Sequence, residues 1–92
     1  MRVLIIEDER KLSNIVRKGL IEEGFAVDQA FDGEEGQYLA ESESYDLIIL
    51  DIMLPDMDGY AICRQLRQTP RTSHIPIIFL TQKDERSDRI AG

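Results

Sequence analysis

Three short, continuously apolar runs constrain the fold of this chain more than any other feature of its sequence. They cover residues 3–6, 47–50 and 75–80, and Pro76 interrupts the third run near its start. Runs of this length that are rich in Ile and Val are typical of strands buried on both faces, as in a parallel sheet covered by helices. A weaker strand is predicted over residues 25–30, where Ala and Gln dilute the apolar signal. We expect that strand at an edge of the sheet.

Amphipathic stretches at helical spacing separate the predicted strands. Gly24 ends the first stretch, and Asp32 opens the second with Glu35 three positions later. That spacing of a capping residue and a Glu is typical of a helix start. The third stretch carries Ile62 and Leu66 on its apolar face. In the first stretch, the residues predicted to face the sheet are Leu12, Ile15, Val16 and Leu20.

Strands and helices are therefore predicted to alternate, ending in a partial fourth helix near Asp84. Such alternation specifies an α/β domain with right-handed crossovers. One strand and helix take roughly 25 residues, so 92 residues hold slightly under four such units. Residues 77–80 have the composition of an interior strand, yet no later strand follows to pair with them. We expect one domain over residues 1–92, incomplete at its C-terminus and truncated before a fifth strand.

The charge balance and the single cysteine exclude several classes of protein. Acidic residues number 18 against 11 Lys and Arg, for a formal net charge of −7. This segment is therefore not expected to bind nucleic-acid phosphates by itself. Cys63 is the only cysteine, which excludes an internal disulfide and suits a reducing compartment. No apolar run in the sequence reaches the length of a membrane span, and we expect a cytoplasmic protein.

Three acidic residues follow the ends of two predicted strands. Glu7 and Asp8 come directly after the first strand, and Asp51 comes after the strand over residues 47–50. Open α/β sheets bind ligands beyond the carboxyl ends of their strands, at the point where the strand order reverses. In a flavodoxin-like order of 2-1-3-4-5, that point lies between the first and third strands. We expect the three carboxylates to meet there.

Carboxylates that meet in one crevice either raise one another's pKa or recruit a cation. Oxygen ligands without His or Cys favour a hard ion, and carboxylates with retained waters describe Mg2+ better than Ca2+. With Mg2+ present, Asp51 could act as a nucleophile and form an acyl phosphate. The Thr81 hydroxyl, after the fourth strand, could then bond a phosphoryl oxygen. An alternative stays open, since Glu7, Asp8 or Glu9 could serve only to cap the following helix, and so could Thr81.

Three segments of the chain together resemble the receiver domains of two-component response regulators, which have a CheY-like fold. The matching segments are residues 3–9, 45–59 and 75–81, and they agree in order, spacing and placement on strand ends. Residues 53–59, Met-Leu-Pro-Asp-Met-Asp-Gly, are especially similar to the OmpR/PhoB branch, whose members join a receiver to a DNA-binding domain. The resemblance implies a doubly wound parallel sheet of strand order 2-1-3-4, with a fifth strand beyond Gly92.

The resemblance implies a phospho-acceptor switch rather than an enzyme in the usual sense. Asp51 would take a phosphoryl group from a sensor histidine kinase, and the domain would catalyse both its phosphorylation and its dephosphorylation. Glu7, Asp8 and Asp51 would hold Mg2+ with the Met53 backbone carbonyl, and Thr81 would be the switch hydroxyl. The output would be control of transcription through a C-terminal DNA-binding domain outside this chain. The resemblance leaves a homodimer open.

Two departures from the family pattern follow Thr81. Gln82 stands where the family usually has a small side chain, so we expect slower phosphorylation or slower loss of the phosphoryl group. The family lysine that pairs with the phosphoryl group belongs to the fifth strand, beyond Gly92, and Lys83 does not match it.

Two other functions are consistent with the acidic crevice. Mg2+-dependent phosphatases also use an Asp nucleophile after a strand, but they typically add a second Asp two positions later, where this chain has Met53. The other alternative is an interaction module that no longer accepts phosphate. The intact set of Glu7, Asp8 and Asp51 argues against it.

Overall fold

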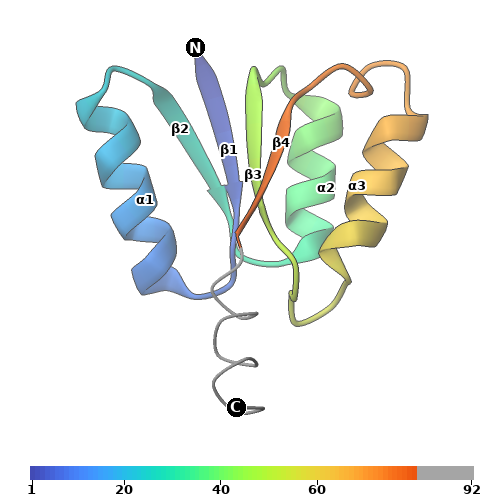
Figure 1. The fold of residues 1–92 in the computed structure, drawn as a ribbon, viewed down its shortest axis with the longest axis horizontal. Helices are drawn as coiled ribbons and strands as arrows, with labels where there is room; N and C mark the ends of the chain where they lie inside the picture. Colours follow the sequence, from blue (N-terminus) through green and yellow to red (C-terminus); the bar gives the residue numbers. More distant parts are fainter. Residues whose placement is uncertain (81–92) are drawn as a thin grey trace.

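The computed structural model describes residues 1–80, in which strands and helices alternate. The strands are β1 (Arg2–Ile6), β2 (Ala26–Ala30), β3 (Leu47–Asp51) and β4 (Ile77–Leu80), and the helices are α1 (Arg10–Glu22), α2 (Gly33–Ser42) and α3 (Gly59–Gln68). Figure 1 shows the sheet in the centre with helices on both sides. None of these three helices is both long and apolar enough to cross a membrane. The helix predicted near Asp84 lies outside the described residues.

The four strands form one parallel sheet with the order β2-β1-β3-β4. This order confirms the predicted doubly wound arrangement, and it places β2 at an edge as expected. The register pairs Ile6 with Ala30 on one side and with Leu50 on the other. Because all four strands run the same way, their carboxyl ends gather at one end of the sheet (Figure 1).

Alternate residues of β1 face opposite sides of the sheet, and all but the first are fully buried. Leu4 and Ile6 belong to the cluster that includes residues of α2 and α3, whereas Val3 and Ile5 pack with Val16 of α1 and its neighbours. A strand that is apolar on both faces requires a helical layer on each side to exclude water. Figure 1 shows these layers, with α1 on one side of the sheet and α2 beside α3 on the other.

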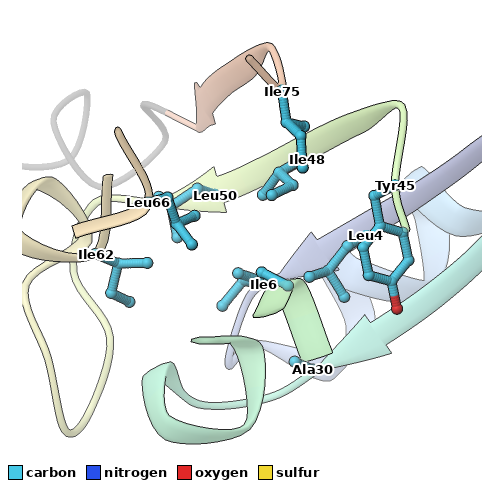
Figure 2. Packing of buried hydrophobic residues seen from close by; sticks show 10 residues of the cluster. Leu4, Ile6, Ala30, Tyr45, Ile48, Leu50, Ile62, Leu66 and Ile75 are labelled. Carbon is cyan, nitrogen blue, oxygen red and sulfur yellow. The ribbon is translucent and has the colours of Figure 1, made fainter. Parts of the chain in front are cut away.

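The larger hydrophobic cluster lies between the sheet and the layer formed by α2 and α3 (Figure 2). Ile62 and Leu66, one turn apart on α3, are almost fully buried in it, as predicted. Gly36 lets α2 approach β1 closely, because a Cβ at that position would lie 2.7 Å from the Ile6 side chain. This packing fixes the distance between the sheet and the helix that begins near the carboxyl ends of the strands.

The side of α1 that faces the sheet differs from the prediction at one residue. Ile15 is 62% exposed, and Ser13 is fully buried instead. The stripe that packs on the sheet runs through Val16 and Leu20, and Ile15 lies beyond its border. The buried Ser13 hydroxyl is satisfied because it accepts a hydrogen bond from Gln29 Nε2 at 2.8 Å. A polar residue therefore occupies a position where periodicity alone predicts an apolar one.

The fourth strand is shorter than the apolar run that predicted it. β4 begins at Ile77, and Ile75 is buried ahead of it. Pro76 has no N–H to donate to the sheet, although its carbonyl accepts the Ile48 N–H at 3.0 Å. Within residues 1–80, β4 pairs with β3 alone, and Ile78 is exposed. The fifth strand expected beyond Gly92 remains a prediction.

Two predicted helix boundaries are confirmed by their backbone geometry. Gly24 follows α1 with a φ of 95°, a left-handed conformation that favours glycine after a helix. Asp32 caps α2, since its carboxylate accepts the Glu35 N–H at 2.8 Å. The chain therefore leaves the carboxyl end of β2 and enters α2 through a single capped turn.

Candidate functional site

An acidic cluster lies at the carboxyl end of the sheet, where β1 and β3 end side by side. Glu7 and Asp8 follow β1 directly, and Asp51 is the last residue of β3. Each residue offers a carboxylate oxygen, and these oxygens all lie within 4.8 Å of one another. The structure therefore brings together the three carboxylates that the sequence placed on strand ends.

Burial governs the electrostatics of this cluster. Glu7 and Asp51 are each 1% exposed, whereas Asp8 is more open to solvent. Burial, together with the neighbouring carboxyls of Asp8 and Asp51, raises the pKa of Glu7 to about 7. The Glu9 N–H opposes this rise by donating a hydrogen bond to Glu7 Oε2 at 2.9 Å. A divalent cation among the carboxylates would favour their charged forms.

Helix capping accounts for little of this arrangement. Glu9 is the residue before α1, and its side chain makes no capping hydrogen bond. The Glu7 carboxylate accepts the Glu9 N–H, so it orders the turn between β1 and α1 rather than the first turn of the helix. Capping therefore leaves the burial of Glu7 beside two other carboxyls unexplained.

The loop after Asp51 is tied to the acidic cluster at its start. The Met53 N–H donates to Asp51 Oδ1 at 3.2 Å. Farther along, the Gly59 N–H donates to the Ile52 carbonyl at 2.7 Å and closes the base of the loop. A Cβ on Gly59 would collide with the Asp51 carbonyl, so glycine is required at this close approach.

An open cavity of about 500 Å³ lies along the same loop, lined by residues 52–58 and Tyr60. Met53 and Tyr60 are about half exposed, which gives the cavity an apolar rim. The Tyr60 ring packs against Phe79 of β4 with 5.0 Å between ring centroids. The start of α3 is thereby joined to the fourth strand.

Sequence reasoning missed the contact made by Asp56. Its carboxylate accepts the N–H groups of Gly33 at 2.7 Å and Glu34 at 2.9 Å, at the start of α2. The Gly33 hydrogen bond, helped by that of Glu34, holds the pKa of the Asp56 carboxyl below its ordinary value. The partners lie 23 and 22 residues away in the sequence, so no local pattern signals this contact.

Several predicted roles are not addressed by residues 1–80. Thr81, Gln82 and Lys83 lie outside the described residues, so the switch hydroxyl and the effect of Gln82 stay predictions. Met53 donates its N–H to Asp51 and forms an isolated β-bridge with Asp58, and the role of its carbonyl towards a metal ion stays a prediction.

The donor set of the cluster fits a magnesium ion. All three side chains offer carboxylate oxygens, which is the ligand type that hard divalent cations prefer. The oxygens are close enough together to share one ion, and the exposure of Asp8 leaves room for the waters that Mg2+ usually retains. Glu7, Asp8 and Asp51 are the residues that would hold it.

A doubly wound parallel sheet with an acidic cluster at its switch point defines this chain as a flavodoxin-like domain whose ligand crevice is lined by carboxylates. The profile of the response regulator receiver domain family matches residues 3–92. The chain therefore belongs to that family, as its three motif segments indicated.

Curated relatives share this domain as part of longer proteins. The transcriptional activator protein IrlR of Burkholderia pseudomallei is 49% identical over 92 residues, which are all of this chain and 39% of the relative. The phosphate regulon transcriptional regulatory protein PhoB of Rhizobium meliloti is 43% identical over 91 residues, which are 99% of this chain and 40% of that protein. The chain thus spans about two-fifths of the length of these transcriptional regulators.

Solved structures agree with the fold. The receiver domain of the sensor histidine kinase PA1611 from Pseudomonas aeruginosa superposes with a TM-score of 0.85 at 31% identity, covering 97% of this chain and 73% of that one. That domain has a magnesium ion coordinated in its active site cleft. The receiver domain of a histidine kinase from Syntrophus aciditrophicus gives a TM-score of 0.83 at 33% identity, over 99% of this chain and 72% of that one.

Proposed function

We propose that this receiver domain accepts a phosphoryl group on the Asp51 carboxylate in a Mg2+-dependent reaction. The observation that carries the proposal is the convergence of three carboxylate oxygens within 4.8 Å at the end of a buried strand. Asp51 ends β3 and is held by the Met53 N–H, so one carboxylate is oriented before any partner arrives. Such preorganisation lowers the cost of reaching the reactive geometry.

The proposed reaction has two steps, and the first transfers one phosphoryl group from the histidine of the donor to Asp51. An Asp51 oxygen forms a bond to phosphorus while the bond from phosphorus to the donor nitrogen breaks, and the histidine of the donor leaves with that electron pair. Bound Mg2+ would neutralise charge on the phosphoryl oxygens. Glu7, Asp8 and Asp51 would hold the cation, and the position of Asp51 at the end of β3 would align its free oxygen for in-line attack. Attack by water on the acyl phosphate later restores the carboxylate and releases inorganic phosphate.

The partners of the domain follow from the same chemistry and from its relatives. We propose a sensor histidine kinase as phosphodonor and a cytoplasmic setting in which the two proteins meet. The transcriptional relatives support an output on DNA, through a domain outside this chain. Phosphorylation would bias the domain towards its active state through Thr81, and a homodimer stays a prediction.

Intact-mass measurement tests the proposal. The chain is incubated with Mg2+ and acetyl phosphate, alongside an Asp51→Asn variant. We expect the mass of one phosphoryl group on the wild-type chain and none on the variant. Equal labelling of both chains would contradict the assignment of Asp51. Continuous release of phosphate from small phosphomonoesters, without a stoichiometric label, would favour the phosphatase alternative.

A further inference from the structure

Asp56 joins the loop after β3 to the start of α2, a helix that contributes no residue to the acidic cluster. Its Oδ1 accepts the Gly33 N–H at 2.7 Å, and its Oδ2 accepts the Glu34 N–H at 2.9 Å. The first N–H groups of a helix have no partner within the helix, and they attract a carboxylate. Because each oxygen of Asp56 takes one of these donors, both the position and the direction of the carboxylate are fixed.

A packing contact holds the loop to α2 at the next residue. A Cβ placed on Gly33 would lie 2.8 Å from the Met57 Cβ, closer than real Cβ atoms approach one another. Met57 therefore lies directly against the first residue of α2. The loop is held at two consecutive positions, by hydrogen bonds at Asp56 and by close packing at Met57.

The other end of the same loop reaches the acidic cluster. The Leu54 N–H donates to the Met57 carbonyl at 3.2 Å, which closes a turn that contains Asp56. Met53 directly precedes this turn and donates its N–H to Asp51 Oδ1. Since the turn is closed by its own hydrogen bond, a displacement of Asp56 is passed to Met53 and from there to the Asp51 carboxylate.

We infer that Asp56 is a positioning residue for the cation site: by anchoring the loop on α2, it holds Met53 and the Asp51 carboxylate in the arrangement that binds Mg2+. The inference rests on the proposed function, because the Mg2+ site is part of it. Asp56 itself is no ligand and acts through the loop. If the hydrogen bonds from Gly33 and Glu34 to Asp56 strengthen Mg2+ binding, thermodynamic linkage requires that bound Mg2+ strengthens these hydrogen bonds by the same free energy.

Calorimetric titration of the intact chain with Mg2+ alone tests the inference. The Asp56→Asn variant keeps the side-chain shape but replaces one acceptor oxygen with a donor group, which cannot accept an N–H. The matched control is Glu34→Gln, which removes one negative charge from the same helix end and keeps the backbone N–H that Asp56 binds. We expect the dissociation constant to rise about fivefold or more in Asp56→Asn and less than about twofold in the control, where only a screened surface charge changes.

Amide hydrogen exchange on the wild-type chain provides a second readout that no substitution can disturb. Saturating Mg2+ should slow the exchange of the Gly33 and Glu34 amides. The factor should be about the same as the factor by which Asp56→Asn raises the dissociation constant for Mg2+. Equal Mg2+ affinity in Asp56→Asn and Glu34→Gln would overturn the inference and leave the proposed function intact. Unchanged exchange at the two amides would overturn it as well. Failure of the wild-type chain to bind Mg2+ would overturn the proposed function itself.

Discussion

Acidic residues gather at both ends of the sheet, but their neighbours differ. Near the amino end, the guanidinium of Arg2, the first residue of β1, lies 2.9 Å from Asp28 in the middle of β2 and 3.4 Å from Glu43. The Tyr45 hydroxyl adds a hydrogen bond of 2.6 Å to Asp28. At the carboxyl end, Glu7 is buried beside two other carboxyls, and its pKa is raised to about 7. Among the described residues, the acids near the amino end share the Arg2 guanidinium, whereas the carboxyl end brings three carboxyl groups close together, two of them buried.

This difference distinguishes the acids that contact Arg2 from the acids of the candidate site. The Arg2 guanidinium and the Tyr45 hydroxyl stabilise the charged Asp28 carboxylate, but this ion pair is partly exposed and contributes little to the stability of the fold. Buried carboxylates that face one another cost free energy in their charged forms, and a divalent cation relieves that cost. To judge whether an acidic residue can bind a cation, the charges of its neighbours are therefore more informative than its position on a strand end.

The largest effect expected from this comparison is on Mg2+ affinity. Asp8→Asn removes a carboxylate from the cluster, and we expect the dissociation constant for Mg2+ to rise about 100-fold, because a ligand charge next to a dication is lost. Asp46→Asn makes the same chemical change at the amino end, where Asp46 accepts the Arg2 N–H at 2.8 Å. Its Mg2+ affinity should match the wild type in calorimetric titration. Similar losses in both variants would show that net charge, and not the cluster, attracts the ion.

A smaller effect is expected on the pH dependence of stability in the metal-free protein. Glu7 has a pKa of about 7 when folded and near 4.5 as its ordinary value, so the folded state binds the proton more tightly. Its protonation therefore stabilises the fold, fully so below its ordinary pKa, and this contribution is lost as the pH rises through 7. We expect a difference of about 1–2 kcal/mol, less than the full shift would give, because the neighbouring carboxyls of Asp8 and Asp51 also respond to the charge of Glu7.

Urea unfolding with EDTA measures this dependence. The wild-type chain should have a larger free energy of unfolding at about pH 5.5 than at about pH 8, and the difference should shrink in Glu7→Gln, which cannot titrate. A Glu43→Gln variant at the amino end should keep the wild-type difference. An unchanged slope in Glu7→Gln would show that other groups control the pH dependence.

The smallest effect is expected at the amino end itself. Tyr45→Phe removes the hydroxyl that donates to Asp28 at 2.6 Å while keeping the buried ring. We expect a loss of about 1 kcal/mol in the free energy of unfolding, the usual net worth of one hydrogen bond. Mg2+ affinity should stay at the wild-type value. A loss of Mg2+ affinity in Tyr45→Phe would mean that the two ends of the sheet are coupled and do not act independently.

Local sequence patterns were sufficient to predict much of the fold and the cluster. Runs of Ile, Val and Leu predicted the strands, because a strand buried on both faces must be apolar throughout. Glu7, Asp8 and Asp51 were predicted to converge because parallel strands end at the same side of a sheet. The strand prediction needs only the order of residues along the chain, whereas the convergence of the carboxylates also needs the flavodoxin-like strand order, which places the first strand beside the third.

Contacts between distant segments account for what the sequence could not predict. The buried Ser13 is tolerated because its hydroxyl accepts a hydrogen bond from Gln29 of β2, a partner that helical periodicity does not include. From the sequence, Asp56 is predicted only as one residue of a turn. The packing of α2 against the loop brings the N–H groups of Gly33 and Glu34 to its carboxylate. The pKa of Glu7 likewise depends on burial, which is a property of the assembled layers.

By itself, the sequence determined the order of strands and helices and the identity of the three carboxylates, because hydrophobic periodicity and position on a strand end are local properties. The tertiary structure decided how far those carboxylates are buried, which acids pair with Arg2, and which loop is anchored on which helix. These properties depend on distances between residues far apart in the chain, and such distances exist only once the layers have packed.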